Sequence, residues 1–204
     1  MRTGRILLAA AVLGSGLLAA AGMPAQESMD SIMEKARAQA QEIEKLKKVL
    51  NEEPDQNVRL AAFNLMVENG DPTMRAVAIE AGLASADALL QAAAFKEAIM
   101  SLDRIHLELG VDGGASQEIQ EKSRAYLAKN GDVLVLDLDK KDPKNGTFSG
   151  SGRLKGEVTG THLTYVRGYG SGVLELKDDD AVSGKVTLRV SGSNLEFLAS
   201  GKIR

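Results

Sequence analysis

The pattern of apolar and polar positions changes once along the chain, near residue 130. From Glu27 to about Asn130, apolar residues recur every three or four positions, as on one face of a helix. From about Asp132 onward, apolar and polar residues alternate, which is the period of a strand buried on one side. Asn130-Gly131 lies between the two patterns and is typical of a helix end. We therefore predict an α-helical repeat domain over residues 26–130 and an antiparallel β domain over residues 131–204.

The first predicted helix runs from about Glu27 to Leu50 and has a heptad pattern. Six of the seven a and d positions are apolar in the set Met29, Ile32, Ala36, Gln39, Ile43, Leu46 and Leu50. Such a pattern is found in coiled coils, which predicts self-association through residues 27–50. The alternative is an amphipathic helix that packs on its own domain.

Three copies of a 16-residue repeat follow this helix. Asp55, Asp71 and Asp87 open the copies, and aspartate is a favoured N-cap because its carboxylate accepts the free backbone N–H groups of the first turn. Pro72 occupies the first helical position of the second copy, where its missing N–H group costs nothing. Short helices of this kind stack, because one of them alone cannot bury its apolar face.

The run Asp55-Gln56-Asn57-Val58-Arg59-Leu60-Ala61-Ala62-Phe63-Asn64-Leu65 resembles the second-helix motif of HEAT-type repeats. The resemblance covers residues 55–102 and implies a short stack of helices used mainly for protein binding. Arg59 and Arg75 occupy equivalent places in the first two copies, whereas the third copy has Gln91 there. The two arginines are our candidate protein-binding residues, since guanidinium groups bind carboxylates through paired hydrogen bonds. The alternative is that they pair with acidic side chains inside the stack.

The pattern becomes less regular after Leu102. We expect Asp103–Leu109 to continue a helix, and Gly110–Gly114 to form a loop. Ser116 is placed to cap a last helix that includes Ile119, Tyr126 and Leu127.

The second half of the chain predicts about seven short antiparallel strands. Asn145-Gly146 predicts a tight turn, and Lys177–Asp180 predicts a hairpin tip. The strands fit a β-sandwich or a small, partly closed barrel. The expected fold class is therefore α+β in two segregated parts, with the helical stack first and the β domain second.

Residues 1–25 have the order of a secretory signal peptide: a basic start with Arg2 and Arg5, an apolar run from Ile6 to Leu18, and small residues after it. We expect cleavage after Ala21 or Ala25 and a periplasmic or secreted protein. The alternative is a retained anchoring helix, although the apolar run is shorter than the roughly 20 residues that span a bilayer. No stable membrane insertion is expected after cleavage.

Charge and composition narrow the possible chemistry. Removing residues 1–25 removes two arginines and no acid, so the net charge goes from −3 to −5. A chain of this charge has no general attraction for nucleic acid. The sequence has no cysteine, so it offers neither disulfides nor thiolate ligands for a metal.

Candidate catalytic and metal-binding residues are few. His106 and His162 are the only histidines, and they lie in different halves of the chain. Asp137, Asp139 and Asp142 offer oxygens to Ca²⁺, but two lysines interrupt them, and a solvated turn is the better interpretation. Residues 167–172 are glycine-rich, yet a strand pattern follows them, whereas a phosphate-binding loop opens a helix. We predict no catalytic residue, cofactor or metal.

Together these observations favour an exported, non-catalytic protein of the cell envelope that binds another protein or assembles with itself. One alternative is a β domain that binds a small molecule or glycan, with the helices as a spacer. A second alternative is a hydrolase with no recognisable motif. An apolar surface on the helices would favour protein binding or self-assembly. A pocket at one end of the β domain would favour small-molecule or glycan binding. Converging carboxylates or a His–Ser pair would favour a hydrolase.

Overall fold

The computed structural model describes residues 29–69, 71–178 and 180–203. Two compact units make up the chain, residues 1–39 and residues 40–204. The predicted signal peptide lies outside the described residues, and the described part of the first unit is the helical segment 29–39.

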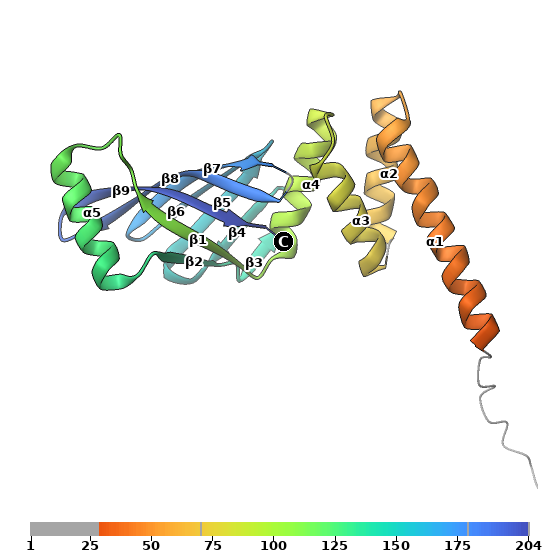
Figure 1. Cartoon of the computed structure of the whole chain (residues 1–204), viewed down its shortest axis with the longest axis horizontal. Coiled ribbons are helices and arrows are strands. Elements are labelled where there is room, and N and C mark those ends of the chain that lie inside the picture. The colour runs from red at the N-terminus through yellow and green to blue at the C-terminus, as the bar shows by residue number, and fades with distance from the viewer. Residues whose placement is uncertain (1–28, 70, 179, 204) are drawn as a thin grey trace, which may run out of the picture. The chain divides into compact units, whose positions relative to one another are not determined.

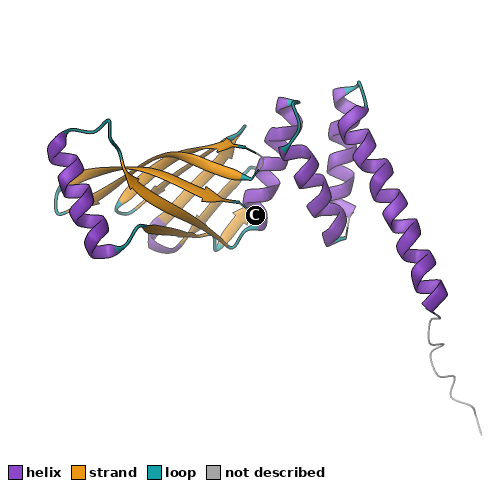
Figure 2. Cartoon of the chain, in the orientation of Figure 1, coloured by secondary structure: helices purple, strands orange, loops and turns teal. Residues whose placement is uncertain are grey.

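Four helices come first, as predicted: α1 (Met29–Glu52), α2 (Gln56–Asn69), α3 (Pro72–Leu83) and α4 (Ala88–Ser101) (Figures 1 and 2). The predicted aspartate caps are confirmed. The Asp71 carboxylate accepts hydrogen bonds from the N–H groups of Thr73 and Met74, and the Asp87 carboxylate accepts from those of Leu89 and Leu90. At the start of α2, the Asp55 carboxylate accepts from the Asn57 N–H group. Local sequence signals thus define where these short helices begin.

Helices α3 and α4 pack closely because a glycine lies between them. A Cβ atom added at Gly82 would lie only 2.5 Å from the Cβ atom of Ala94, and 3.3 Å from the ring of Phe63. The buried side chains of the helices, including Phe63, Leu83 and Phe95, belong to the same apolar cluster as those of the sheet.

One nine-stranded antiparallel sheet makes up the β part of the described residues. Its strands lie side by side in the order β2-β1-β9-β8-β7-β6-β5-β4-β3. The bounds are β1 (Arg104–Val111), β2 (Val133–Asp137), β3 (Lys140–Asp142), β4 (Thr147–Gly150), β5 (Leu154–Thr159), β6 (His162–Arg167), β7 (Gly170–Lys177), β8 (Ala181–Val190) and β9 (Ser193–Lys202). Helix α5 (Gln117–Asn130) joins β1 to β2, and a 3₁₀ turn, Ser151–Arg153, joins β4 to β5.

The sheet curls into a half-barrel (Figure 2), so the predicted segregated α+β class is confirmed in its barrel-like form. The described residues form nine strands where we expected about seven, and one curled sheet where a two-sheet sandwich was the alternative. Along β7, Leu174 and Leu176 point into the half-barrel, whereas Val173 and Lys177 point to solvent. The alternating apolar and polar residues of the sequence thus face the inside of the half-barrel and the solvent in turn.

The predicted helix over Asp103–Leu109 is wrong, because Arg104–Val111 forms strand β1. Ile105, Leu107 and Leu109 are buried in alternation, and β1 pairs with both β2 and β9. Its partner on one side, β9, lies about 90 residues further along the chain, so nothing local in the sequence indicates this pairing. The sheet therefore begins before the boundary expected at residues 130–131.

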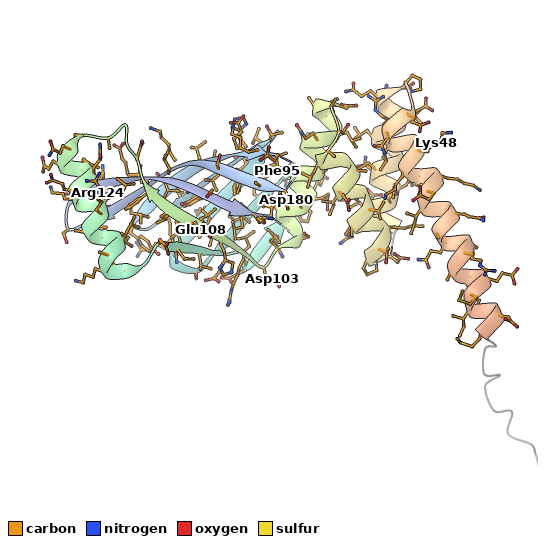
Figure 3. All side chains as sticks on the ribbon, viewed as in Figure 1. Lys48, Phe95, Asp103, Glu108, Arg124 and Asp180 are labelled. Carbon is orange, nitrogen blue, oxygen red and sulfur yellow. The ribbon has the colours of Figure 1, made fainter. Side chains whose placement is uncertain are left out.

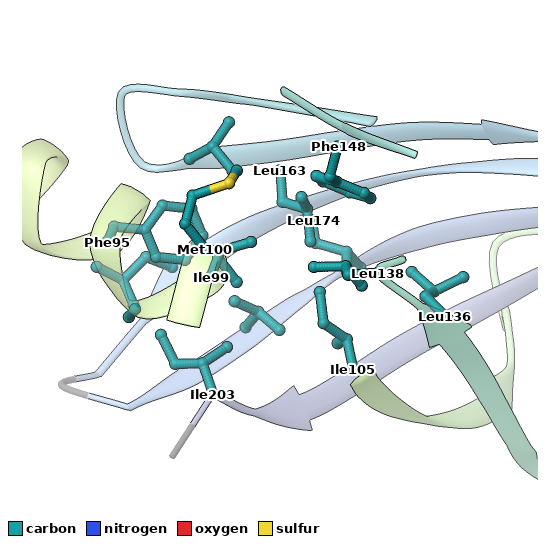
Figure 4. Packing of buried hydrophobic residues seen from close by; sticks show 14 of the residues in the cluster. Phe95, Ile99, Met100, Ile105, Leu136, Leu138, Phe148, Leu163, Leu174 and Ile203 are labelled. Carbon is teal, nitrogen blue, oxygen red and sulfur yellow. The ribbon is translucent and has the colours of Figure 1, made fainter. Parts of the chain in front are cut away.

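Helices α4 and α5 lie at opposite ends of the half-barrel (Figure 1). At one end, Phe95, Ile99 and Met100 of α4 pack toward Ile105, Leu163, Leu174 and Ile203 of the sheet (Figure 4). At the other end, the Tyr126 ring of α5 contacts the Phe197 ring of β9, with centroids 5.7 Å apart. Asp180 and Arg124 mark these two ends in Figure 3.

Candidate functional site

Arg59 and Arg75 make contacts inside the helical stack. The Arg59 guanidinium donates hydrogen bonds to the Asp87 carboxylate, to the Glu53 carbonyl and to the Pro54 carbonyl. The Arg75 guanidinium donates to the carbonyl of Val67, with its Nη2 atom at 2.9 Å. A role toward a partner protein stays a prediction, and these contacts give both residues a structural role.

The third copy of the repeat explains this structural role. Gln91, at the position equivalent to Arg59 and Arg75, donates from its Nε2 atom to the Leu83 carbonyl at 3.1 Å. In each copy the side chain thus bonds carbonyls at or just beyond the end of the preceding helix, which has no backbone donor for its last carbonyls. Arginine in the first two copies and glutamine in the third thus supply the same kind of contact, a long side-chain donor to a backbone carbonyl.

The N-terminal part of α1 exposes apolar side chains to solvent. Met29, Ile32 and Met33 are 75%, 46% and 48% exposed, and they recur at three- and four-residue spacing along one side of the helix. Further along the same helix, Leu50 is buried. Helix α2 also exposes Val58 and Leu65, which lie seven residues apart on one face. The helices therefore present apolar surface of the kind that binds partners.

The two histidines do not converge. His106 lies on β1 and His162 on β6, with β9, β8 and β7 between them, and both side chains are on the exposed face of the sheet. Within the described residues, no group of three or more His, Cys, Asp or Glu side chains is arranged to hold a metal ion. Asp137 pairs instead with Arg104 at 2.8 Å, and Asp142 accepts hydrogen bonds from Asn145 in the turn.

Asp112, at the end of β1, is a buried carboxylate whose charge is compensated. Its Oδ2 atom lies 2.8 Å from the Lys185 ammonium, and its Oδ1 atom accepts a hydrogen bond from the Gly114 N–H group. The Lys185 ammonium lowers the pKa of Asp112, so this carboxylate stays ionised at neutral pH. A carboxylate held in this way ties the loop after β1 to β8 and is poorly suited to act as a general acid.

The glycine-rich segment 167–172 covers the end of β6, the turn at Gly168 and Tyr169, and the start of β7, in agreement with the strand pattern that follows it. Arg167 at its start donates from Nη1 to the Val135 carbonyl on edge strand β2, at 2.9 Å. The guanidinium also lies 4.8 Å from the centre of the Tyr169 ring. Arg167 thus holds the free edge of the sheet, a role that sequence reasoning did not identify because it depends on the curl.

Among the described residues, the hollows on the half-barrel include two with the volume of small-molecule sites. One, of about 710 Å³, is an open trough on the outer face of β3–β7, where Lys155, Val166 and Val173 face solvent. The other, of about 580 Å³, lies between α5 and the β8–β9 hairpin, and we call it the α5 groove. Its lining residues are Lys122, Ala125, Tyr126, Lys129, Asn130, Val190, Ser191, Ser193 and Leu195. No local sequence pattern indicates this groove, because its walls come from segments about 60 residues apart.

Comparisons with protein-family models, curated proteins and solved structures found no match to this chain. Among the described helices, none has both the length and the apolar character needed to cross a bilayer.

Proposed function

We propose that this chain is an exported, non-catalytic protein of the cell envelope that binds another protein or assembles with itself through its N-terminal helices. Export is supported by the basic start, apolar run and small residues of positions 1–25. The helical resemblance of residues 55–102 to HEAT-type repeats supports a binding role for the same part of the chain.

The observation that carries this proposal is the exposed apolar side of α1. Met29, Ile32 and Met33 lie in water, although burying a large apolar side chain stabilises a protein by roughly 1.5–3 kcal/mol. Single exposed apolar residues are common, but a row of them at helical spacing is typical of a helix that packs against a partner.

The arrangement of titratable groups favours binding over catalysis. Three strands separate the two histidines, and the buried Asp112 is paired with Lys185. Nucleophilic or general acid–base catalysis needs such groups within hydrogen-bond distance of one another and of the substrate.

A test replaces the apolar side of α1 while keeping the helix. In the variant Ile32→Gln/Met33→Gln, we expect loss of the partner or of the self-assembled state, because glutamine is a good helix former but contributes little apolar contact. The matched control, Asp30→Asn/Glu34→Gln, changes exposed charged positions of the same turns and should leave the interaction intact.

The measurement is site-specific photo-crosslinking from position 33 in cells, together with light scattering of the purified chain. An adduct with a second copy indicates self-assembly, and an adduct with another protein identifies the partner. A monomeric chain that forms no adduct, or an adduct that the glutamine variant retains, contradicts the proposal.

A further inference from the structure

The floor of the α5 groove is apolar and fixed in place. Leu195 and Val190 lie on the inner face of the sheet, and α5 supplies Ala125 and Tyr126 from the other side. The Tyr126 ring is held against the Phe197 ring, so this wall of the groove does not depend on a ligand to form it. The lining thus joins the inner apolar face of the sheet, through Val190 and Leu195, to α5.

The rim of the groove is polar and cationic. The Lys122 ammonium lies 3.5 Å from the Ser193 hydroxyl, so the two groups can bind the same acceptor atom. Lys129 lies two turns further along α5, and Ser191 and Asn130 also line the groove. The residues that line it, all of them described, include two lysines and no carboxylate.

The charged side chains near the groove add to the positive character of its rim. Glu118 lies 2.7 Å from the Lys122 ammonium, but its side chain is 76% exposed and is not part of the lining. On the other face of the β8–β9 hairpin, a smaller hollow contains Arg167, Arg189 and Asn194, and again no carboxylate. The charged side chains that line these two hollows are therefore all cationic, in a chain whose net charge is −3.

From this combination we propose that the α5 groove binds a free amphiphile with one hydrocarbon chain and a carboxylate head group. The hydrocarbon chain lies on Ala125, Tyr126 and Val190, above the buried Leu195. The carboxylate accepts hydrogen bonds from Lys122 and Ser193. The volume of about 580 Å³ falls within the usual range of about 300–1,000 Å³ for small-molecule sites, which often occupy barrel mouths. This site is separate from the helical surface proposed above, so either proposal can fail without the other.

The test uses dodecanoate as the probe, with calorimetric titration of the purified full chain. We expect one bound molecule per chain, and binding weaker by about tenfold or more in Lys122→Gln/Lys129→Gln, because charged hydrogen-bond donors are lost. Glu118→Gln should strengthen binding, since it frees Lys122 from its competing partner. Dodecanol should bind more weakly than dodecanoate, and dodecyltrimethylammonium should not compete.

A matched pair of variants locates the site. Ala125→Phe fills the groove and should abolish binding, whereas Ala128→Phe adds the same ring at an exposed position of α5 outside the lining and should not. Circular dichroism confirms that both variants fold. The proposal is overturned if dodecanoate does not bind, if Ala125→Phe binds as well as Ala128→Phe, or if the chain binds only phosphatidylglycerol vesicles.

Discussion

At the scale of single residues, Asp87 connects two copies of the repeat. Its Oδ1 atom accepts hydrogen bonds from the Leu89 and Leu90 N–H groups at the start of α4, and from the Gln56 side chain at 2.7 Å. Its Oδ2 atom accepts from the Arg59 guanidinium, and the Asp87 side chain is only 6% exposed. One carboxylate thus caps α4 and fixes α2 beside it.

This arrangement predicts an acid-dependent loss of stability. The hydrogen bond from Arg59, and then that from Gln56, lowers the pKa of Asp87 from 3.8 to about 2 in the folded chain. The pKa of Asp87 is lower in the folded chain than in the unfolded chain. The ionised carboxylate therefore adds its full contribution to the free energy of unfolding above about pH 4–5, and this contribution is lost as the pH falls toward 2. Asp87→Asn keeps the cap but loses the ion pair, so its melting temperature should lie below that of the wild type at pH 7.

Thermal melts between pH 7 and pH 2 check this prediction. The difference in melting temperature between Asp87→Asn and the wild type should become smaller below pH 4. Asp55→Asn serves as control, because Asp55 caps α2 and asparagine caps equally well. A deficit for Asp87→Asn that stays constant down to pH 2 would show that the ion pair contributes nothing.

At the scale of elements, edge strand β2 is held by side chains on its open side. Arg167 donates to the Val135 carbonyl, and the Ser151 hydroxyl donates to Asp137 at 2.9 Å. Two glycines make this close approach possible. A Cβ atom added at Gly150 would lie 1.7 Å from the backbone carbonyl oxygen of Asp137, and one added at Gly152 would lie 2.8 Å from the Arg167 Nε atom. An unpaired edge of this kind is otherwise open to pairing with other chains.

We predict that Arg167→Leu loosens β2 without unfolding the sheet. Amide hydrogen exchange over residues 133–137 should become faster, because the strand loses a contact on its open side, while exchange in β8 should stay slow. Arg189→Leu removes a guanidinium from β8 and is the control. Equal exchange in the two variants would mean that the Arg167–Val135 hydrogen bond does not hold the edge.

At the scale of the whole molecule, α4 connects the helical stack to the sheet. Phe95, Ala98 and Ile99 are buried, and they belong to one cluster with Ile105, Leu163 and Ile203 (Figure 4). The helices of residues 40–101 and the half-barrel therefore share a core. The sequence boundary between helical and strand patterns is not a boundary in the packing.

A shared core predicts that both parts unfold together. Tyr126, Tyr165 and Tyr169, the only tyrosines, all lie in α5 or the sheet part, so tyrosine fluorescence reports on the sheet while circular dichroism reports on the helices. Phe95→Ala should lower the free energy of unfolding by about 3–5 kcal/mol. The melting temperatures followed by fluorescence and by circular dichroism should fall together. Leu89→Ala, at an exposed position of the same helix, should change neither. Two separate transitions in the wild type would refute the shared core.

Features that depend on neighbouring residues can be predicted from the local sequence alone. Asp55, Asp71, Asp87 and Ser116 begin their helices as expected. Gly131, with φ of 84°, follows the end of α5. These signals are readable because an N-cap bonds N–H groups two or three residues away, and a C-cap requires one permissive residue.

Features that depend on residues distant in the sequence become visible only in the folded chain. Arg104–Val111 is a strand because β9 pairs with it, and the sheet curls because one face must be buried with α4 and α5 at its ends. The α5 groove needs Lys122 beside Ser193, which are 71 residues apart in the sequence. Position 59 and its equivalents acquire their role only when each helix lies against the one before it. Contacts of this kind depend on how the chain folds back on itself, which a local pattern of residue types does not encode.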